Sequence, residues 1–213
     1  MRPVAYILGG FGTKLKHLKT ACKIYEKNNI EVKFLKTDEI FWMSPKIFKK
    51  KAKLICNSIN KDDKFFLHGI SAGYLQLYEI NKNIGNKPIG NIIESGPGIL
   101  DSEKYQDLLK ETTKIHIPKF FLEKSLKISG YTYWEENEHN NHIISNGIVL
   151  IGKNDKYVDF NNLNSYIENN KKIKKITFDN SSHCNIQKND KIKYEKVLDN
   201  FIKRKLTDLN KEL

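Results

Sequence analysis

Short runs of apolar residues, separated by segments with helical spacing, constrain the fold of this 213-residue chain more than any other feature. Most runs end at glycine or at polar residues, which is typical of strands buried in a parallel sheet. The alternation of such strands with helices predicts an α/β fold with a mainly parallel sheet of about six strands. The predicted strands are Val4–Leu8, Val32–Leu35, Phe65–Leu67, Ile89–Ile93, Ile148–Ile151 and Ile176–Phe178.

The segments between these strands carry apolar residues at helical spacing. Ser44-Pro45 is typical of a helix start, because proline is favoured at the first helical position. The predicted helices run from Leu15 to about Asn28, from Pro45 to Ile59, directly after Gly73, and roughly from Lys191 to Leu206.

The segment from about residue 97 to residue 146 interrupts this alternation. It contains helical patterns and an aromatic cluster at Tyr131, Tyr133 and Trp134. A structureless loop of that length would be unusual, so we expect a small cap or lid inserted before the fifth strand of a single domain spanning 1–213. Tyr131 and Trp134 are therefore candidate substrate-binding residues.

The chain has a formal net charge of +12, but Arg2 and Arg204 are its only arginines among 37 basic residues. Arginine is the usual residue for reading guanine and for bidentate contact with phosphate, so the composition argues against a specific nucleic-acid partner. The frequent pairing of lysine with asparagine indicates an AT-rich genome. We expect the basic surface to favour, at most, a weak association with an anionic membrane surface.

The three cysteines, Cys22, Cys56 and Cys184, form no C-x-x-C pair and no disulfide framework. The sequence has no stretch approaching 18 apolar residues and no signal peptide, so we expect a cytoplasmic protein. His139 and His142 have a spacing that can bind metal, but a solvated loop is the better interpretation because no second pair accompanies them. We therefore predict no metal and no cofactor.

The stretch FFLHGISAG places Ser71 between Gly69 and Gly73, directly after an apolar strand and before a helical pattern. This G-x-S-x-G pattern is typical of a nucleophile elbow, in which small neighbours let the strand and the next helix approach closely. The pattern alone is weak, and an ordinary glycine-rich turn is the alternative. A serine hydroxyl also needs a base to take its proton.

An acid and a histidine follow Ser71 in the order that the elbow motif requires. Asp155 comes just after the strand GIVLIG, and His183 just after the strand KKITF. Both positions lie at carboxyl ends of strands, where active sites of open α/β sheets form. The predicted catalytic residues are Ser71, Asp155 and His183, with Glu94 as an alternative acid at the end of the fourth strand.

The developing oxyanion would need two backbone N–H groups. We assign one to Ala72, the residue after the nucleophile, and the other to Phe11 in the glycine loop after the first strand. Gly10 in that loop is a candidate substrate-binding residue, although it could serve only strand–helix packing. His68, beside the elbow, is either a pocket residue or a packed histidine.

In this order, these segments resemble the α/β-hydrolase superfamily and, more narrowly, the DUF829 group that includes the relatives of transmembrane protein 53. The resemblance covers most of the chain outside the cap and rests on the segments YILGGFGTKLKHLKTACKIY, FLHGISAGY, IIESGPG, VLIGKNDKYVDF and ITFDNSSHCNIQ. It implies an α/β-hydrolase fold that starts at the strand carrying the oxyanion loop. It also implies that Ser71, Asp155 and His183 occupy the triad positions.

The expected activity is that of a serine hydrolase acting on a small-molecule carboxylic ester or thioester, through a Ser-Asp-His triad and an acyl-enzyme. The aromatic cap could shelter an acyl chain, which favours a lipid-like or acylated substrate. The alternative is a non-catalytic binding or scaffold protein with the same fold.

Overall fold

The computed structural model describes most of the chain outside the predicted cap. The described residues are 2–10, 13–35, 45–59, 63–84, 87–96, 107, 110, 118, 120, 121, 124, 144, 146–158, 160–168 and 172–211.

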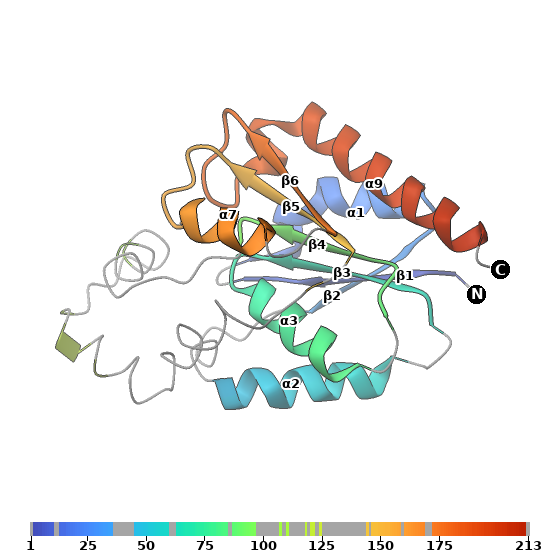
Figure 1. The fold of residues 1–213 in the computed structure, drawn as a ribbon, viewed down its shortest axis with the longest axis horizontal. Helices are drawn as coiled ribbons and strands as arrows, with labels where there is room; N and C mark the ends of the chain where they lie inside the picture. The colour runs from blue at the N-terminus through green and yellow to red at the C-terminus, as the bar shows by residue number, and fades with distance from the viewer. Residues whose placement is uncertain are drawn as a thin grey trace.

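Six parallel strands form a single sheet in the order β2-β1-β3-β4-β5-β6. The strands are β1 (Val4–Leu8), β2 (Glu31–Leu35), β3 (Phe65–Ile70), β4 (Gly90–Glu94), β5 (Gly147–Gly152) and β6 (Ile173–Phe178). The described helices are the short η1 (Leu15–Leu18), α1 (Lys19–Lys27), α2 (Pro45–Ser58), α3 (Gly73–Asn83), α7 (Phe160–Glu168), α8 (Ile186–Asn189) and α9 (Lys191–Lys211). Figure 1 shows this order along the chain.

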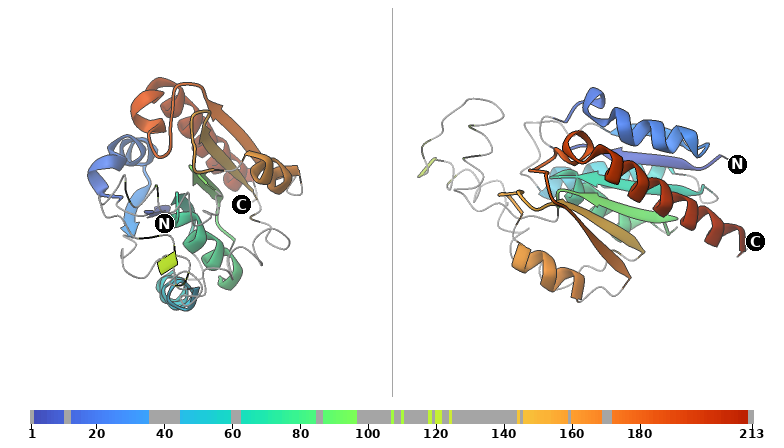
Figure 2. Two further views of the ribbon diagram at one scale, coloured as in Figure 1. Left: turned by 90° about the vertical axis from the view of Figure 1, so that its left-hand side faces the viewer. Right: turned by 90° about the horizontal axis from the view of Figure 1, so that it is seen from above.

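Helices cover both faces of the sheet, with α1 and α9 on one face and α2 and α3 on the other (Figures 1 and 2). The strands β1, β3, β4 and β5 are buried along their whole length, as expected for a parallel sheet between two helical layers. In β1, Val4, Tyr6 and Leu8 pack on the α2 and α3 side, whereas Ala5 and Ile7 pack on the α1 and α9 side.

The chain reverses its direction of travel across the sheet between β1 and β3. It passes from β1 outward to β2, and then returns across β1 to β3 and onward to β6. Right-handed crossovers place helices on opposite faces when this direction reverses, which is why α1 and α2 lie on different sides. Such a switch point opens a crevice at the carboxyl ends of the two strands, and both Gly10 and Ser71 follow those ends.

The predicted strands and the four predicted helices are all present, with shifted ends. Strand β6 begins at Ile173, three residues before the predicted Ile176, because Lys174 and Lys175 interrupt its apolar pattern. The helices α7 and α8 were not predicted as elements. The four-residue α8 is too short to give a helical pattern, whereas α7 has Phe160, Leu163 and Ile167 at helical spacing and could have been predicted from it. The helices in the described part of the chain are all too short or too polar to cross a lipid bilayer.

Candidate active site

Ser71 occupies a sharp turn between β3 and α3. Its φ angle is 50°, in the left-handed region that non-glycine residues rarely adopt. Backbone hydrogen bonds fix the turn: the Ser71 N–H donates to the Glu94 carbonyl at 2.8 Å, and the Tyr74 N–H donates to the Ser71 carbonyl at 2.9 Å. The side chain is partly exposed and sits at the carboxyl edge of the sheet.

Both glycines of the G-x-S-x-G motif are required by close approach of backbone atoms. A Cβ atom at Gly73 would lie 1.9 Å from the Leu8 carbonyl oxygen, and one at Gly69 would lie 2.9 Å from the Tyr74 Cα. Helix α3 therefore packs directly against the ends of β1 and β3. The motif has the geometry of a nucleophile elbow, rather than that of a loosely packed glycine turn.

His183 and Asp155 lie beside Ser71, although they are distant from it in the sequence. The Ser71 Oγ lies 2.9 Å from the His183 Nε2, and the His183 Nδ1 lies 3.0 and 2.9 Å from the two Asp155 carboxylate oxygens. An ionised carboxylate can only accept hydrogen bonds, so the proton of the neutral imidazole belongs on Nδ1. The Nε2 is then free to accept the Ser71 hydroxyl proton.

Asp155 is held rigidly in a turn after β5. Its carboxylate Oδ1 accepts backbone N–H groups from Tyr157 at 3.0 Å and from Val158 at 3.2 Å, and the residue is 4% exposed. The Tyr157 ring packs edge-on against the His183 imidazole, with ring centroids 5.1 Å apart. These contacts fix both the carboxylate and the imidazole plane. The sequence offered no motif that would identify Tyr157 as a positioning residue.

The loop that carries His183 is joined to its neighbours at two points. A Cβ atom at Gly152 would lie 2.1 Å from the Ser181 carbonyl oxygen, so the loop packs on the end of β5. The Cys184 N–H donates to the Ser95 Oγ at 2.9 Å, which attaches the loop to the end of β4. Ser95 is a second positioning residue, and no motif in the sequence identifies it as one.

The environment of His183 alters its affinity for a proton. Burial lowers the pKa of the imidazole, but the adjacent Cys184 side chain and the Asp155 carboxylate raise it more, to about 10. The geometry therefore favours the imidazolium form, which is the form that a base adopts after taking the serine proton.

The residues predicted for the oxyanion site are described in part. A Cβ atom at Gly10 would lie 2.8 Å from the Ser71 Cβ and 3.0 Å from the Ala72 backbone nitrogen, so the loop after β1 meets the elbow directly. Ala72 is partly exposed beside Ser71. The predicted second donor, Phe11, lies outside the described residues.

His68 and Glu94 belong to a buried polar cluster beneath the site, on the α1 and α9 side of the sheet. The Glu94 carboxylate accepts hydrogen bonds from the Tyr194 hydroxyl at 3.0 Å and from the Gln187 amide at 3.1 Å, and it lies 3.4 Å from the His68 Nε2. The Tyr25 hydroxyl lies 3.3 Å from the His68 Nδ1. Burial and the Glu94 charge hold the pKa of the Tyr25 and Tyr194 hydroxyls well above the usual value.

The burial of Glu94 and His68 in this cluster bears on the roles predicted for them, an alternative catalytic acid and a pocket residue. Glu94 is 1% exposed, and the carboxylate that contacts His183 belongs to Asp155. His68 has no exposed surface, so it occupies the packed position that was the alternative to a pocket residue. Substrate contact with His68 would require the overlying residues to move.

The other predicted residues lie beyond what the structure describes. Tyr131, Trp134, His139 and His142, with most of the predicted cap, are outside the described residues. Within the ranges that are described, no three histidine, cysteine or acidic side chains gather as metal ligands.

Comparison with solved structures assigns the chain the α/β-hydrolase fold. No model of a known protein family and no curated protein matches the sequence. Est1E from Butyrivibrio proteoclasticus superposes with a TM-score of 0.71 at 12% identity, over 97% of this chain and 89% of that one. An α/β hydrolase from the metagenome of Mar Chica lagoon sediments, MGS-MChE2, gives 0.70 at 12% identity, over 96% and 92%. Mouse alpha/beta hydrolase domain-containing protein 10 gives 0.68 at 14% identity, over 95% and 90%.

Proposed function

We propose that this chain is a serine hydrolase that cleaves a carboxylic ester or thioester through an acyl-enzyme. The observation that carries the proposal is the continuous hydrogen-bonded chain Ser71–His183–Asp155, built from three loops at one sheet edge. The similar structures support it more generally, since several of them are esterases or α/β hydrolases.

The proposed reaction begins when the Ser71 Oγ attacks the substrate carbonyl carbon and its proton passes to the His183 Nε2. Asp155 keeps the imidazole in the required tautomer and stabilises the imidazolium. The oxyanion of the tetrahedral intermediate accepts the Ala72 N–H and an N–H from the loop after β1, for which Phe11 remains our candidate. His183 then returns the proton to the departing alcohol or thiol.

A second half-reaction releases the acid. Water attacks the acyl-enzyme while His183 takes one of its protons, and Ser71 departs with that proton restored. The arrangement favours this reaction over a purely non-catalytic role. That alternative predicts an occluded Ser71 or a His183 turned away, whereas Ser71 is partly exposed and within hydrogen-bond distance of the imidazole.

Three finer expectations belong to this proposal. The narrower likeness to the DUF829 group, a lipid-like acyl substrate and a weak contact with anionic membranes remain predictions from the sequence. The acyl substrate depends on Tyr131 and Trp134 of the cap.

Labelling by a fluorophosphonate probe tests the proposal. We expect the wild-type chain to be labelled and to hydrolyse small aryl esters, and Ser71→Ala to lose labelling completely with a fall in kcat of at least about a thousandfold. Ser58→Ala is the matched control, because Ser58 is an exposed serine on α2 whose hydroxyl donates to the Ile55 carbonyl of the same helix. Labelling that survives in Ser71→Ala would overturn the proposal, as would the absence of labelling in a folded wild-type chain.

A further inference from the structure

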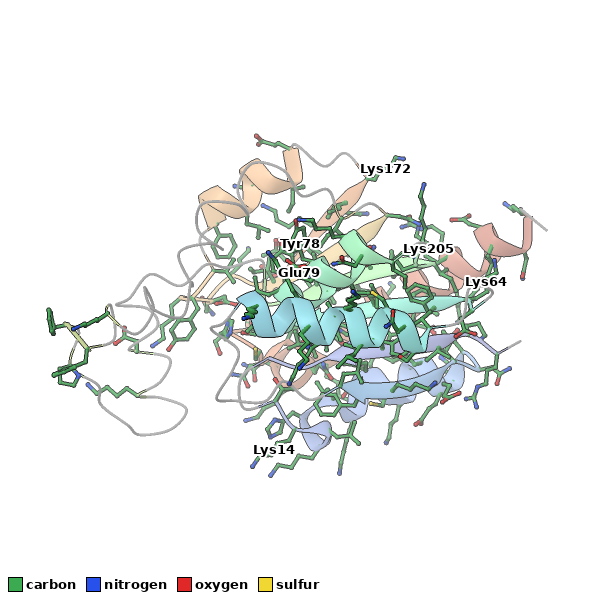
Figure 3. All side chains as sticks on the ribbon, turned by 90° about the horizontal axis from the view of Figure 1, so that it is seen from below. Lys14, Lys64, Tyr78, Glu79, Lys172 and Lys205 are labelled. Carbon is green, nitrogen blue, oxygen red and sulfur yellow. The ribbon has the colours of Figure 1, made fainter. Side chains whose placement is uncertain are left out.

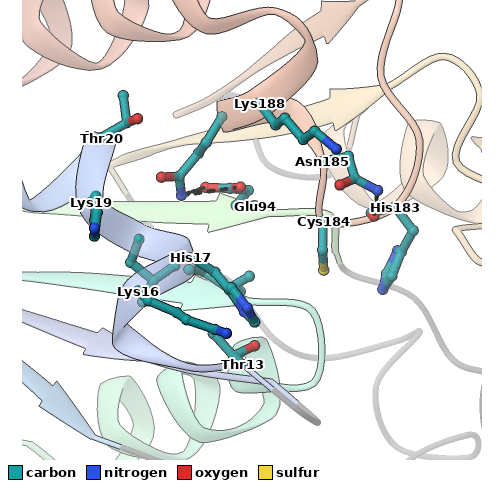
Figure 4. Close-up of a pocket in the computed structure, with 13 residues that line it drawn as sticks. Thr13, Lys16, His17, Lys19, Thr20, Glu94, His183, Cys184, Asn185 and Lys188 are labelled. Atoms are coloured by element: carbon teal, nitrogen blue, oxygen red, sulfur yellow. Dashed lines mark hydrogen bonds between the residues drawn. The ribbon is translucent and has the colours of Figure 1, made fainter. Parts of the chain in front are cut away.

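A cleft adjoins His183 on the α1 and α9 side of the sheet edge (Figure 4). It has a volume of about 490 Å³ and lies between the segment 13–20 and the segment 183–188. Ile70 and Glu94 contribute to its lining from the ends of β3 and β4. The Ala21 N–H donates to the Gln187 side chain at 3.3 Å, which joins the two walls at the base.

The position of His183 indicates which part of the substrate would enter this cleft. In the proposed reaction, the imidazole that takes the Ser71 proton gives it to the departing oxygen or sulfur atom. The leaving group must therefore lie on the His183 side of Ser71. Because His183 and Cys184 line the cleft, a leaving group that extends past His183 enters it.

The lining of the cleft is basic. Lys16, Lys19 and Lys188 line it, and none of them forms an ion pair with a residue that the structure describes. Leu18 and Ile70 are the aliphatic residues among the thirteen that line it. The negative charge of Glu94 is already satisfied by Tyr194 and Gln187, so the unpaired charges facing solvent there are positive.

We infer that this cleft binds the leaving group of the substrate, and that this leaving group carries an anionic group such as a phosphate. The inference rests on the proposed function. The bond from the carbonyl carbon to the leaving oxygen or sulfur breaks, the His183 proton moves to that atom, and the phosphorylated alcohol or thiol departs. A purely aliphatic chain would contact the apolar atoms that line the cleft, but it would desolvate the lysines without replacing their hydration.

Matched pairs of esters test this inference. The first pair is phenyl acetate with a para-CH₂OH or a para-CH₂OPO₃²⁻ substituent, so that only the leaving group differs. The second pair is a phenyl butanoate whose acyl chain ends in a methyl ether or in a phosphate. At low ionic strength we expect kcat/KM to be about tenfold higher for the phosphorylated member of the first pair alone. Added salt should reduce that ratio by screening.

Charge reversal in the cleft should change this ratio. The double variant Lys16→Glu, Lys188→Glu is expected to bring the ratio below one, since two carboxylates would face the phosphate. The control is Lys64→Glu, Lys172→Glu, which makes the same change in net charge at exposed positions preceding β3 and β6 (Figure 3). We expect the control to leave the wild-type ratio unchanged.

Three outcomes would overturn the inference. Equal rates within the first pair, with both esters hydrolysed, would show that the cleft does not select an anionic leaving group while the hydrolase proposal stands. A preference for phosphate on the acyl chain would show that the cleft holds the other half of the substrate. Failure to hydrolyse any of the four esters, without Ser71 labelling, would reject the hydrolase itself and this inference with it.

Discussion

Three residues of the site have a left-handed backbone although none is glycine. Ser71, Ser95 and Cys184 have φ angles of 50°, 54° and 56°. Each such residue costs about 1–3 kcal/mol, so surrounding contacts must hold it in place. Here those contacts are the Ser71–Glu94 backbone hydrogen bond and the Cys184–Ser95 hydrogen bond. The conformation aims the serine hydroxyl and the histidine loop at each other.

The protonation of His183 should govern the pH dependence of activity. The imidazole must be neutral to accept the Ser71 proton, and its pKa is raised to about 10. We therefore expect kcat/KM for a neutral aryl ester to keep rising with pH above the ordinary histidine pKa of about 6.5, to reach half its maximum near pH 10 and to level off only above that pH. Rate profiles from pH 6 to pH 11 at constant ionic strength measure this.

Cys184→Ser should move that profile to lower pH, because the Cys184 side chain helps to raise the His183 pKa. Cys56→Ser is the control and should leave the profile in place, because Cys56 is a partly buried thiol on α2 that contacts the Ile80 carbonyl of α3. The raised His183 pKa also makes the stability of the fold depend on pH, and stability falls over the pH range in which activity rises. The stabilisation from the His183–Asp155 pair is fully present below about pH 6.5 and is lost as the pH rises through about 10. An acidic limb centred at 6.5 in the wild type would contradict this account.

At the scale of elements, close contact of α3 with β1 and β3 positions the nucleophile. Gly73 is the first residue of α3 and meets the Leu8 carbonyl, while Gly10, just after β1, meets Ser71 and Ala72 of the elbow. The end of β1, the loop after it and the start of α3 are therefore packed too tightly for any Cβ atom at these positions. This packing brings the loop after β1 against Ser71 and Ala72.

Gly73→Ala should destabilise the fold, although alanine is favoured over glycine in helices by about 1 kcal/mol. The new Cβ would lie 1.9 Å from a backbone oxygen, so α3 must move. We expect the free energy of unfolding to fall by about 3 kcal/mol or more in urea titrations, with loss of probe labelling.

Gly96→Ala is the matched control for that substitution. A Cβ atom there would meet the Ile93 Cγ2 at 3.4 Å and the Ser71 carbonyl oxygen at 3.6 Å, which are ordinary contacts. We expect a change of no more than about 0.5 kcal/mol. Equal effects of the two substitutions would show that contact of α3 with β1 does not set the geometry of the elbow.

At the scale of the whole molecule, the two faces of the sheet differ in the kinds of side chains that pack the helices against them. The α2 and α3 side is mostly an apolar core, whereas the α1 and α9 side also contains the polar cluster Tyr25, His68, Glu94, Gln187 and Tyr194. The cluster connects α1, α8 and α9 to β3 and β4. A buried carboxylate is tolerated only when donors satisfy it, so these helices must dock together.

Tyr194→Phe should therefore cost about 1–3 kcal/mol of unfolding free energy, because it removes a hydrogen-bond donor from the buried Glu94. Ser71 labelling should persist in the folded protein, since the hydroxyl does not touch the triad. Tyr6→Phe is the control: Tyr6 is also buried, but its hydroxyl makes no hydrogen bond to a residue that the structure describes. A larger loss for Tyr6→Phe would contradict the role of the cluster.

The alternation of strands and helices follows from the sequence, and so does the set of candidate catalytic residues, with Glu94 and Asp155 as the two candidate acids. Buried strands and glycine turns leave local patterns, so β1 to β6 and the G-x-S-x-G elbow could be predicted before any contact was known. The order Ser71, Asp155, His183 followed from the places where those strands end. Helix α8 could not be predicted, since four residues carry too little periodicity.

Which of these residues meet depends on the tertiary structure. Glu94 is the last residue of β4 and Asp155 follows β5, but the alternation of side chains along β4 directs Glu94 into the core with Tyr194, whereas the turn after β5 directs Asp155 to His183. It also placed His68 beneath the site and brought the basic segments 13–20 and 183–188 to opposite walls of one cleft. These pairings join residues that are 28 positions apart for Asp155 and His183 and 100 apart for Glu94 and Tyr194. Local sequence cannot specify them, because they depend on the crossovers and packing of the whole sheet.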